Sequence, residues 1–191
     1  MNPPKDSLLI IGAGQYGLVA LEIAQAMDQF DKIAFLDDSY KAPTASPTAS
    51  HPERSEGSSP AVIGSTRDLE KFAAQYSYGF VAIGNPQVRR TLLEKMQFCG
   101  ITPATLIHPT AYISPSAQLQ KGCCVEPLAV VQTGVAIATA SFIASGAVIR
   151  HNSAISEFCH IDCNAVVQTG AMVPNDTKVP CNIVFAPPTA H

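Results

Sequence analysis

The chain of 191 residues has few of the features that mark nucleic-acid-binding or membrane proteins. It carries 12 lysines and arginines against 15 acidic residues, and the basic residues form no cluster, so we expect no nucleic-acid partner. No apolar run approaches the roughly 20 residues that cross a bilayer, and the N-terminus lacks the long apolar stretch of a signal peptide. We therefore expect a cytoplasmic protein with no membrane span.

The familiar zinc-binding cysteine patterns are also missing. The six cysteines, which we expect to be reduced thiols, are Cys99, Cys123, Cys124, Cys159, Cys163 and Cys181. Of these, Cys159 and Cys163 have a spacing that half of a metal site can have. Packing of these small residues in a tight core is the simpler interpretation, so we expect no metal. Apolar residues, in contrast, make up 47% of the chain, which is enough for a substantial core.

Short apolar runs alternate with helical patterns in the first half of the chain. The predicted strands are 7–12, 32–38, 79–85 and 104–109. The predicted helices are 15–27, 67–76 and 86–100. This alternation is typical of a parallel sheet covered by helices on both faces.

The turn after the first predicted strand fits a dinucleotide-binding pattern. Gly12, Gly14 and Gly17 have the required spacing, and Asp37 lies 20 residues after Gly17, where an acid that binds ribose is expected. The same pattern also serves NAD, FAD, nucleotide-sugars or simply a tight turn. Because only about 100 residues precede the next architecture, the size favours half of a dinucleotide fold and a mononucleotide ligand.

Residues 39–60 are rich in Pro, Ser, Thr and Ala and contain almost no large apolar side chains. Such a segment buries too little surface to offset the entropy lost on ordering. We expect a mobile surface loop, and we expect no catalytic role for His51 inside it.

An aliphatic residue recurs at every sixth position from Ile113 to Val179, and a mostly small residue lies two places before each. A period of six fits neither an α-helix nor a β-hairpin. It is typical of a parallel β-helix, in which three hexapeptides make one coil and residues 18 apart stack. We expect about four coils between residues 108 and 180, with the aliphatic side chains inside.

The segments "IIGAGQYG", "FLDD" and "AIGN", followed by repeats that begin "LIHPTAYISPSA", together resemble the bacterial sugar acyltransferases of the sialic acid O-acetyltransferase (NeuD/PglD-like) family. The resemblance implies an α/β half-Rossmann domain in residues 1–106, a left-handed parallel β-helix in residues 107–191, and a homotrimer with active sites between subunits. It also implies acetyl-CoA-dependent acetylation of a UDP-linked amino sugar, or of a sialic-acid-type sugar, in bacterial glycan biosynthesis.

The same resemblance assigns roles in the segment "AVIRHNSAISEFCHI". His151 matches the family's general base, and its imidazole would take a proton from the attacking sugar group, with no covalent intermediate. Asn152, where the family usually has Glu or Asp, would orient that ring. His160 matches a histidine near the acetyl-CoA thioester, and Thr169, where a glycine is usual, would contact the cofactor together with Gly170. Both histidines should reach the surface, and a polar turn or outward-facing residue is the alternative for each.

The resemblance also implies a nucleotide-sugar site in the α/β domain. The glycine turn would bind the phosphates, two acids would meet the uridine ribose or base, and the segment "GN" would border the pocket. These residues are Gly12, Gly14, Gln15, Gly17, Asp37, Asp38, Gly84 and Asn85. Gln15 stands where the family commonly has a histidine. His108 is expected at the hinge between the domains.

The repeats end earlier than is usual in the family, which would remove coils that cradle the cofactor. This departure leaves open a second interpretation: a catalytically impaired, shortened relative that serves as a nucleotide-sugar-binding or scaffold protein. An NAD-linked oxidoreductase is a third possibility, which depends on the glycine pattern alone.

Overall fold

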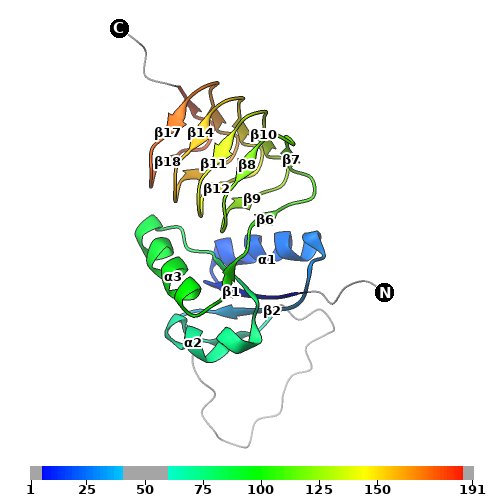
Figure 1. Ribbon diagram of the computed structural model, residues 1–191, viewed down its shortest axis with the longest axis vertical. Helices are drawn as coiled ribbons and strands as arrows, with labels where there is room; N and C mark the ends of the chain where they lie inside the picture. Colours follow the sequence, from blue (N-terminus) through cyan, green and yellow to red (C-terminus); the bar gives the residue numbers. More distant parts are fainter. Residues whose placement is uncertain (1–5, 41–59, 187–191) are drawn as a thin grey trace, which may run out of the picture.

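The computed structural model describes residues 6–40 and 60–186. Most of the predicted loop 39–60, including His51, lies outside the described residues. An α/β domain comes first, and a stack of short strands forms a left-handed parallel β-helix above it in Figure 1. Among the described residues, no helix combines the length and the apolar character needed to cross a bilayer.

The α/β domain is built on a five-stranded parallel sheet with the order β3-β2-β1-β4-β5. Its strands are β1 (Asp6–Ile11), β2 (Phe30–Leu36), β3 (Val62–Gly64), β4 (Tyr78–Val81) and β5 (Thr102–Pro103). The longer helices are α1 (Gln15–Met27) and α3 (Pro86–Phe98). The four residues 8–11 of the central strand β1 are 0% exposed, which agrees with a sheet covered on both faces.

Two details of this domain differ from the sequence-based expectation. The helix expected at 67–76 is broken into a 3-10 turn (Thr66–Asp68), a single α turn, α2 (Leu69–Phe72), and a second 3-10 turn (Ala73–Gln75). The short strand β3 was not expected at all. Three residues at the edge of a sheet give too short a pattern to be recognised in the sequence.

The β-helix consists of two-residue strands in three parallel sheets. One sheet contains β6 (Leu106–Ile107), β9 (Cys124–Val125), β12 (Phe142–Ile143), β15 (His160–Ile161) and β18 (Lys178–Val179). The second contains β7 (Tyr112–Ile113), β10 (Val130–Val131), β13 (Val148–Ile149), β16 (Val166–Val167) and β19 (Val184–Phe185). The third contains β8 (Gln118–Leu119), β11 (Ala136–Ile137), β14 (Ala154–Ile155) and β17 (Met172–Val173).

The register of these sheets confirms the period of six. Ile149 pairs with Val131 and with Val167, each 18 residues away, and the second residue of each strand points into the prism. The strand expected at 104–109 does not join the α/β sheet, because Leu106–Ile107 pairs with β9 and the sheet ends instead with β5 (Thr102–Pro103). Ile107 continues the six-residue series one step before Ile113, so its side chain fits the β-helix core.

The corners of the β-helix follow an equally strict rule. A residue with positive φ recurs at every sixth position from Gly122 to Asn182. Gly, Asn and Asp tolerate this left-handed conformation best, and they hold most of these positions. Asn152, with φ of 58°, is one of these corner residues, so the backbone alone gives a reason for its identity.

The two domains share apolar clusters of buried side chains. On the side of α1, the ring of Tyr16 stacks on Phe142 of the β-helix, with ring centroids 4.5 Å apart. On the side of α3, Leu93 belongs to the same cluster as Ala140 and Phe158 at a β-helix corner. Burial on both sides of the α/β sheet therefore fixes the β-helix on the α/β domain.

A buried arginine joins the domains at this corner. Arg89 of α3 is 1% exposed, and its guanidinium donates hydrogen bonds to the carbonyls of Ala140 (3.0 Å) and Phe158 (2.7 Å) across the interface. It also donates to the carbonyls of Ile83 (2.6 Å) and Gly84 (3.1 Å) at the end of β4. Burial lowers the pKa of Arg89 to about 10, so the side chain still carries its charge at neutral pH.

We expect Ile149→Asp to lower the free energy of unfolding by more than about 3 kcal/mol, because it places an unpaired charge in the fully buried core of the β-helix. Urea denaturation followed by circular dichroism measures the change. Arg150→Asp, at the adjacent exposed position, is the control and should change stability by less than about 1 kcal/mol. Equal stability of the two variants would contradict the inward register.

We expect Arg89→Met to destabilise the protein by more than about 3 kcal/mol, because it leaves four buried or partly buried carbonyls, two in each domain, without this donor. Arg90→Met is the matched control. Arg90 pairs with Glu157 (3.1 Å) and Asp176 (3.2 Å) at a partly exposed position, where loss of the pairs should cost about 1 kcal/mol or less. Thermal unfolding compares the two variants, and an equal effect would show that the buried arginine is not the main link.

Candidate functional site

The glycine turn lies at the carboxyl end of β1, at the point where the strand order reverses between β1 and β4. Open α/β sheets bind ligands at such a point. Gly12 has φ of 103°, and a Cβ on Gly17 would lie 2.1 Å from the carbonyl oxygen of Gly12, so both glycines are required by the turn itself. Gly14, which caps α1, and Gln15 are exposed, and nothing lies within 4 Å of a Cβ added to Gly14. Gly14 therefore has the open surroundings that a phosphate needs.

The two predicted ribose-binding acids hold neighbouring loops in place. Asp37 accepts hydrogen bonds from the backbone N–H of Ala13 (2.7 Å) and from the N–H (2.9 Å) and hydroxyl of Ser39. These bonds, the Ser39 hydroxyl first, hold the pKa of Asp37 below its usual range. Asp38 accepts from the N–H (3.0 Å) and hydroxyl (2.8 Å) of Thr66. The contact of Asp37 with Ala13 sets the position of the glycine turn.

The segment Gly84–Asn85 closes the other side of this edge. The side-chain oxygen of Asn85 accepts from the N–H of Val88 (3.0 Å) and caps α3. The N-termini of α1 and α3 thus flank the ends of β1 and β4, and their unpaired N–H groups favour an anion there. A pocket of about 320 Å³ lies nearby, lined by Asp38, Thr66, Gln87, Val88, Thr91 and Leu92.

His151 lies at a β-helix corner, in the turn that follows β13. It lines an open pocket of about 460 Å³ together with Tyr112, Gln132, Thr133 and Asn152. The side-chain oxygen of Gln132, one coil earlier, lies 3.1 Å from the backbone N of His151 and 3.4 Å from its Nδ1. An amide oxygen only accepts, so a hydrogen bond in this contact has Nδ1–H as its donor, and the acceptor nitrogen of the neutral imidazole is then Nε2.

The side chain that contacts the ring is Gln132, a residue not expected from the sequence. Its signal is its place in the repeat, because residues 18 to 19 apart are neighbours in adjacent coils. Asn152, expected to have this role, lies with its side-chain oxygen over the corner of the preceding coil, 2.5 Å from where a Cβ on Gly134 would be. The left-handed backbone at Asn152 explains this direction.

The predicted cofactor residues Thr169 and Gly170 lie one coil beyond His151, at the same corner. The N–H of Gly170 donates to the carbonyl of His151 (3.3 Å), and Thr169 is exposed. The structure therefore brings these two residues together with His151, as the stacking of positions 18 apart requires.

His160 lies elsewhere, on the face of the β-helix that meets the α/β domain. Its ring packs edge-on against Tyr16 and Phe142, at 5.9 Å from each ring centroid. It lines a pocket of about 410 Å³ whose other walls are Tyr16, Gly84, Pro86, Arg89, Phe158, Asp176, Thr177 and Lys178. Burial is the main cause that lowers the pKa of His160, so its imidazole is neutral at neutral pH. Within one chain, His151 and His160 line different pockets.

Two further residues, Tyr16 and His108, lie where the two domains meet. The hydroxyl of Tyr16 is buried beside the Cys124 thiol and has no oxygen or nitrogen partner among the described residues. His108, expected at the hinge, directly follows the first β-helix strand, and its Nδ1 lies 2.8 Å from the hydroxyl of Thr110.

Comparison with known proteins agrees with both domains. The model of a family described as the PglD N-terminal domain matches residues 7–96. The acetyltransferase domain of PglB from Neisseria gonorrhoeae is 28% identical, with a TM-score of 0.74, and the match covers 98% of this chain and 99% of that one. The same domain in complex with acetyl coenzyme A gives 29% identity and a TM-score of 0.73, over 96% and 89% of the two chains.

The chain is thus similar to the NeuD/PglD-like hexapeptide-repeat sugar acyltransferases, through the family model over residues 7–96 and through the Neisseria domain over nearly its whole length. The family resemblance of the sequence is thus confirmed, together with the half-Rossmann and left-handed β-helix fold and the acyltransferase class. A perosamine N-acetyltransferase from Caulobacter crescentus, a variant in complex with CoA and GDP-perosamine, has the same fold at 22% identity. Its TM-score is 0.62, over 97% of this chain and 95% of that one.

Proposed function

We propose that the protein transfers the acetyl group of acetyl-CoA to the amino group of a UDP-linked sugar in bacterial glycan biosynthesis, with His151 as general base. The observation that carries the proposal is the geometry of His151: an imidazole in an open pocket, with Nδ1 in contact with Gln132 and with no hydrogen bond to Nε2 from the residues that the structure describes. The acetyl coenzyme A complex of the Neisseria domain supports the choice of co-substrate. The anion-binding edge of the α/β sheet supports a nucleotide-linked acceptor.

The reaction is a direct transfer. The neutral amine attacks the thioester carbonyl carbon, a C–N bond forms, and the C–S bond breaks. Nε2 of His151 takes the proton that the amine loses, and the sulfur leaves with CoA. Thr169 and Gly170, at the same corner as His151, would contact the cofactor.

The arrangement of the pockets supports a site shared between copies of the chain. His151 lies at the corner between the second and third β-helix sheets, whereas the first sheet and the adjacent corner contact α1 and α3. We call the sheet edge formed by the glycine turn and Gly84–Asn85 the nucleotide edge. In one chain, this edge and the proposed base His151 therefore lie on different sides of the β-helix. Next to His151, the second sheet presents an outward row of Tyr112, Val130, Val148, Val166 and Val184, of which the end residues are 57% and 55% exposed.

An apolar row of this kind is suited to burial against a second copy. We propose a homotrimer in which His151 of one copy faces the nucleotide edge and His160 of its neighbour. His160, neutral and close to Gly84, would then contact the thioester or the sugar. A cytoplasmic location, where both substrates are made, fits this proposal.

The alternative of an impaired scaffold protein depended partly on the early end of the repeats. This reason is weakened because the Neisseria domain is matched over 99% of its length. Its other reason, Asn152 in place of an acid, is weakened by Gln132, which supplies a hydrogen bond to the ring. The oxidoreductase alternative is not retained, since the chain is similar to an acetyltransferase domain over 98% of its length.

We expect His151→Ala to lower the rate of CoA thiol release by about 10²- to 10⁴-fold with a UDP-4-amino sugar, because it removes the base. Binding of acetyl-CoA, measured by calorimetry, should change little. The control is His108→Ala, which alters a histidine at the domain junction and should keep the wild-type rate. Unchanged thiol release in His151→Ala would overturn the assignment, and binding of the sugar without any thiol release in wild type would support the scaffold alternative.

Two inactive variants should complement each other if the site is shared. Gly14→Glu places a carboxylate where the phosphates would bind, in space that the fold leaves open, while His151→Ala removes the base. Equal co-expression should restore roughly a quarter of the wild-type rate when base and nucleotide edge come from neighbouring copies. A mixture as inactive as its parents would place both parts in one chain.

A further inference from the structure

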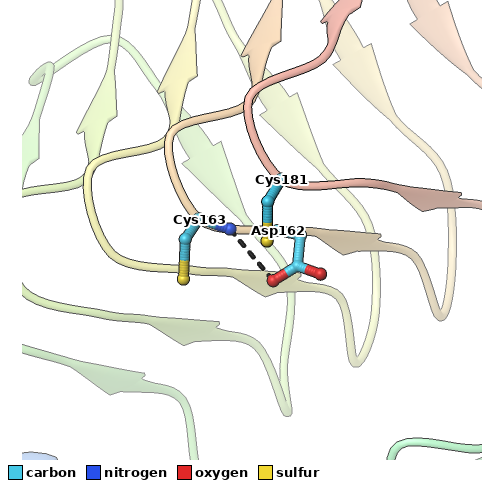
Figure 2. Close-up of side chains that lie close together, drawn as sticks. All are labelled: Asp162, Cys163 and Cys181. Atoms are coloured by element: carbon cyan, nitrogen blue, oxygen red, sulfur yellow. Dashed lines mark hydrogen bonds between the residues drawn. The ribbon is translucent and has the colours of Figure 1, made fainter.

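A second cluster of reactive side chains lies at the corner between the first and second β-helix sheets, and none of its members lines the three pockets described above. Asp162 and Cys163 follow β15, and Cys181 occupies the equivalent corner one coil later (Figure 2). One carboxylate oxygen and the two sulfurs all lie within 4.8 Å of one another. Three metal-ligand atoms from adjacent coils thus converge at the surface.

Core packing does not account for these cysteines. Cys123 and Cys159 are 0% exposed and fill the interior of the β-helix, as expected for small apolar residues. The thiol of Cys159 donates to the carbonyl of Pro174 (2.9 Å) in that interior, so it does not form the half-site with Cys163 that the spacing suggested. Cys163, by contrast, is half-buried and Cys181 is exposed.

The corner itself does not require cysteine either. The equivalent positions of earlier coils are held by Pro109, Pro127 and Ser145. Two sulfurs stacked one coil apart beside a carboxylate therefore call for a chemical explanation, since backbone geometry provides none.

Contacts with neighbouring residues hold the side chain of Asp162 and the two coils in place. Asp162 is fixed by two contacts: its Oδ1 accepts from the N–H of Cys163 (3.0 Å), and its Oδ2 pairs with Nζ of Lys178 (3.0 Å). The N–H of Asn182 donates to the carbonyl of Cys163 (3.0 Å), which holds the two coils in register. The carboxylate of Glu126, two coils earlier, adds negative charge near Cys163.

We propose that Asp162, Cys163 and Cys181 bind a Zn²⁺ ion that links the last two coils of the described β-helix. Thiolates select borderline or soft cations such as Zn²⁺ over Mg²⁺ and Ca²⁺. Tetrahedral Zn²⁺ holds ligand atoms about 3.3 to 3.8 Å apart, so these side chains must approach by about 1 Å, which rotation at an exposed corner allows. Three protein ligands leave the fourth position to water.

The ion would stabilise the last two coils of the described β-helix. Cys181 lies in a coil whose strands pair with a preceding coil only, among the described residues. A metal bond from this coil to Asp162 and Cys163 adds a link that the backbone ladder does not supply. This role is independent of acetyl transfer.

The test uses the full chain, reduced and freed of metal by a chelator. Titration with Zn²⁺ against a chromophoric chelator should show about one tightly bound ion per chain. Titration with Co²⁺ should produce the near-ultraviolet thiolate-to-cobalt charge-transfer band. Zn²⁺ should also raise the melting temperature of the wild type.

The variants are Cys181→Ser and Asp162→Asn, with Cys99→Ser as the matched control because Cys99 is a partly exposed cysteine at the end of α3. Cys181→Ser should weaken Zn²⁺ binding by roughly tenfold or more and abolish the Zn²⁺-dependent rise in melting temperature. Asp162→Asn should weaken binding in the same direction, and Cys99→Ser should behave as wild type. Equal metal-free melting temperatures would show that Cys181→Ser is folded.

Three outcomes would overturn the proposal. One is wild-type Zn²⁺ affinity in Cys181→Ser, and another is Co²⁺ binding without a thiolate band. The third is a Cys163–Cys181 disulfide, seen by mass spectrometry of the unreduced protein, combined with no Zn²⁺ binding after reduction.

Discussion

The arrangement of the molecule depends on one buried charge. Arg89 links the end of β4 to two corners of the β-helix through hydrogen bonds to four carbonyls, and its guanidinium lies over the ring of Phe142 at 4.2 Å. Those carbonyls would otherwise be buried without donors, which costs about 1 to 3 kcal/mol for each group. The same side chain lines the pocket that contains His160. The position of the carboxyl end of β4 relative to the β-helix is therefore set by a residue that also borders a candidate site.

The repeats show how far sequence can predict structure in this chain. The six-residue series predicted the β-helix, its inward side chains and the stacking of positions 18 apart, because each of these follows from a local period. It was harder to predict which sheet the first strand of the β-helix would join. Leu106–Ile107 is a short apolar run that suits either sheet, and its choice of β9 depends on pairing with residues far along the chain.

The site residues divide in the same way. The positions of His151, Thr169 and Gly170 at one corner follow from the repeat, and so does the separation of His160 from them. Gln132 was missed although the repeat itself places it one coil before His151, because a glutamine at a turn usually faces solvent. Arg89 could not be identified beforehand, because its role arises from contacts between the domains, which no local pattern contains.

The β-helix limits where a functional group can be placed. Neighbouring parallel strands are about 4.8 Å apart, so residues 18 apart repeat along a corner at that interval. Thr133, His151 and Thr169 occupy three successive steps of this series. Along a corner, a reactive side chain can thus be placed only at intervals of one strand spacing, and the corner fixes its direction.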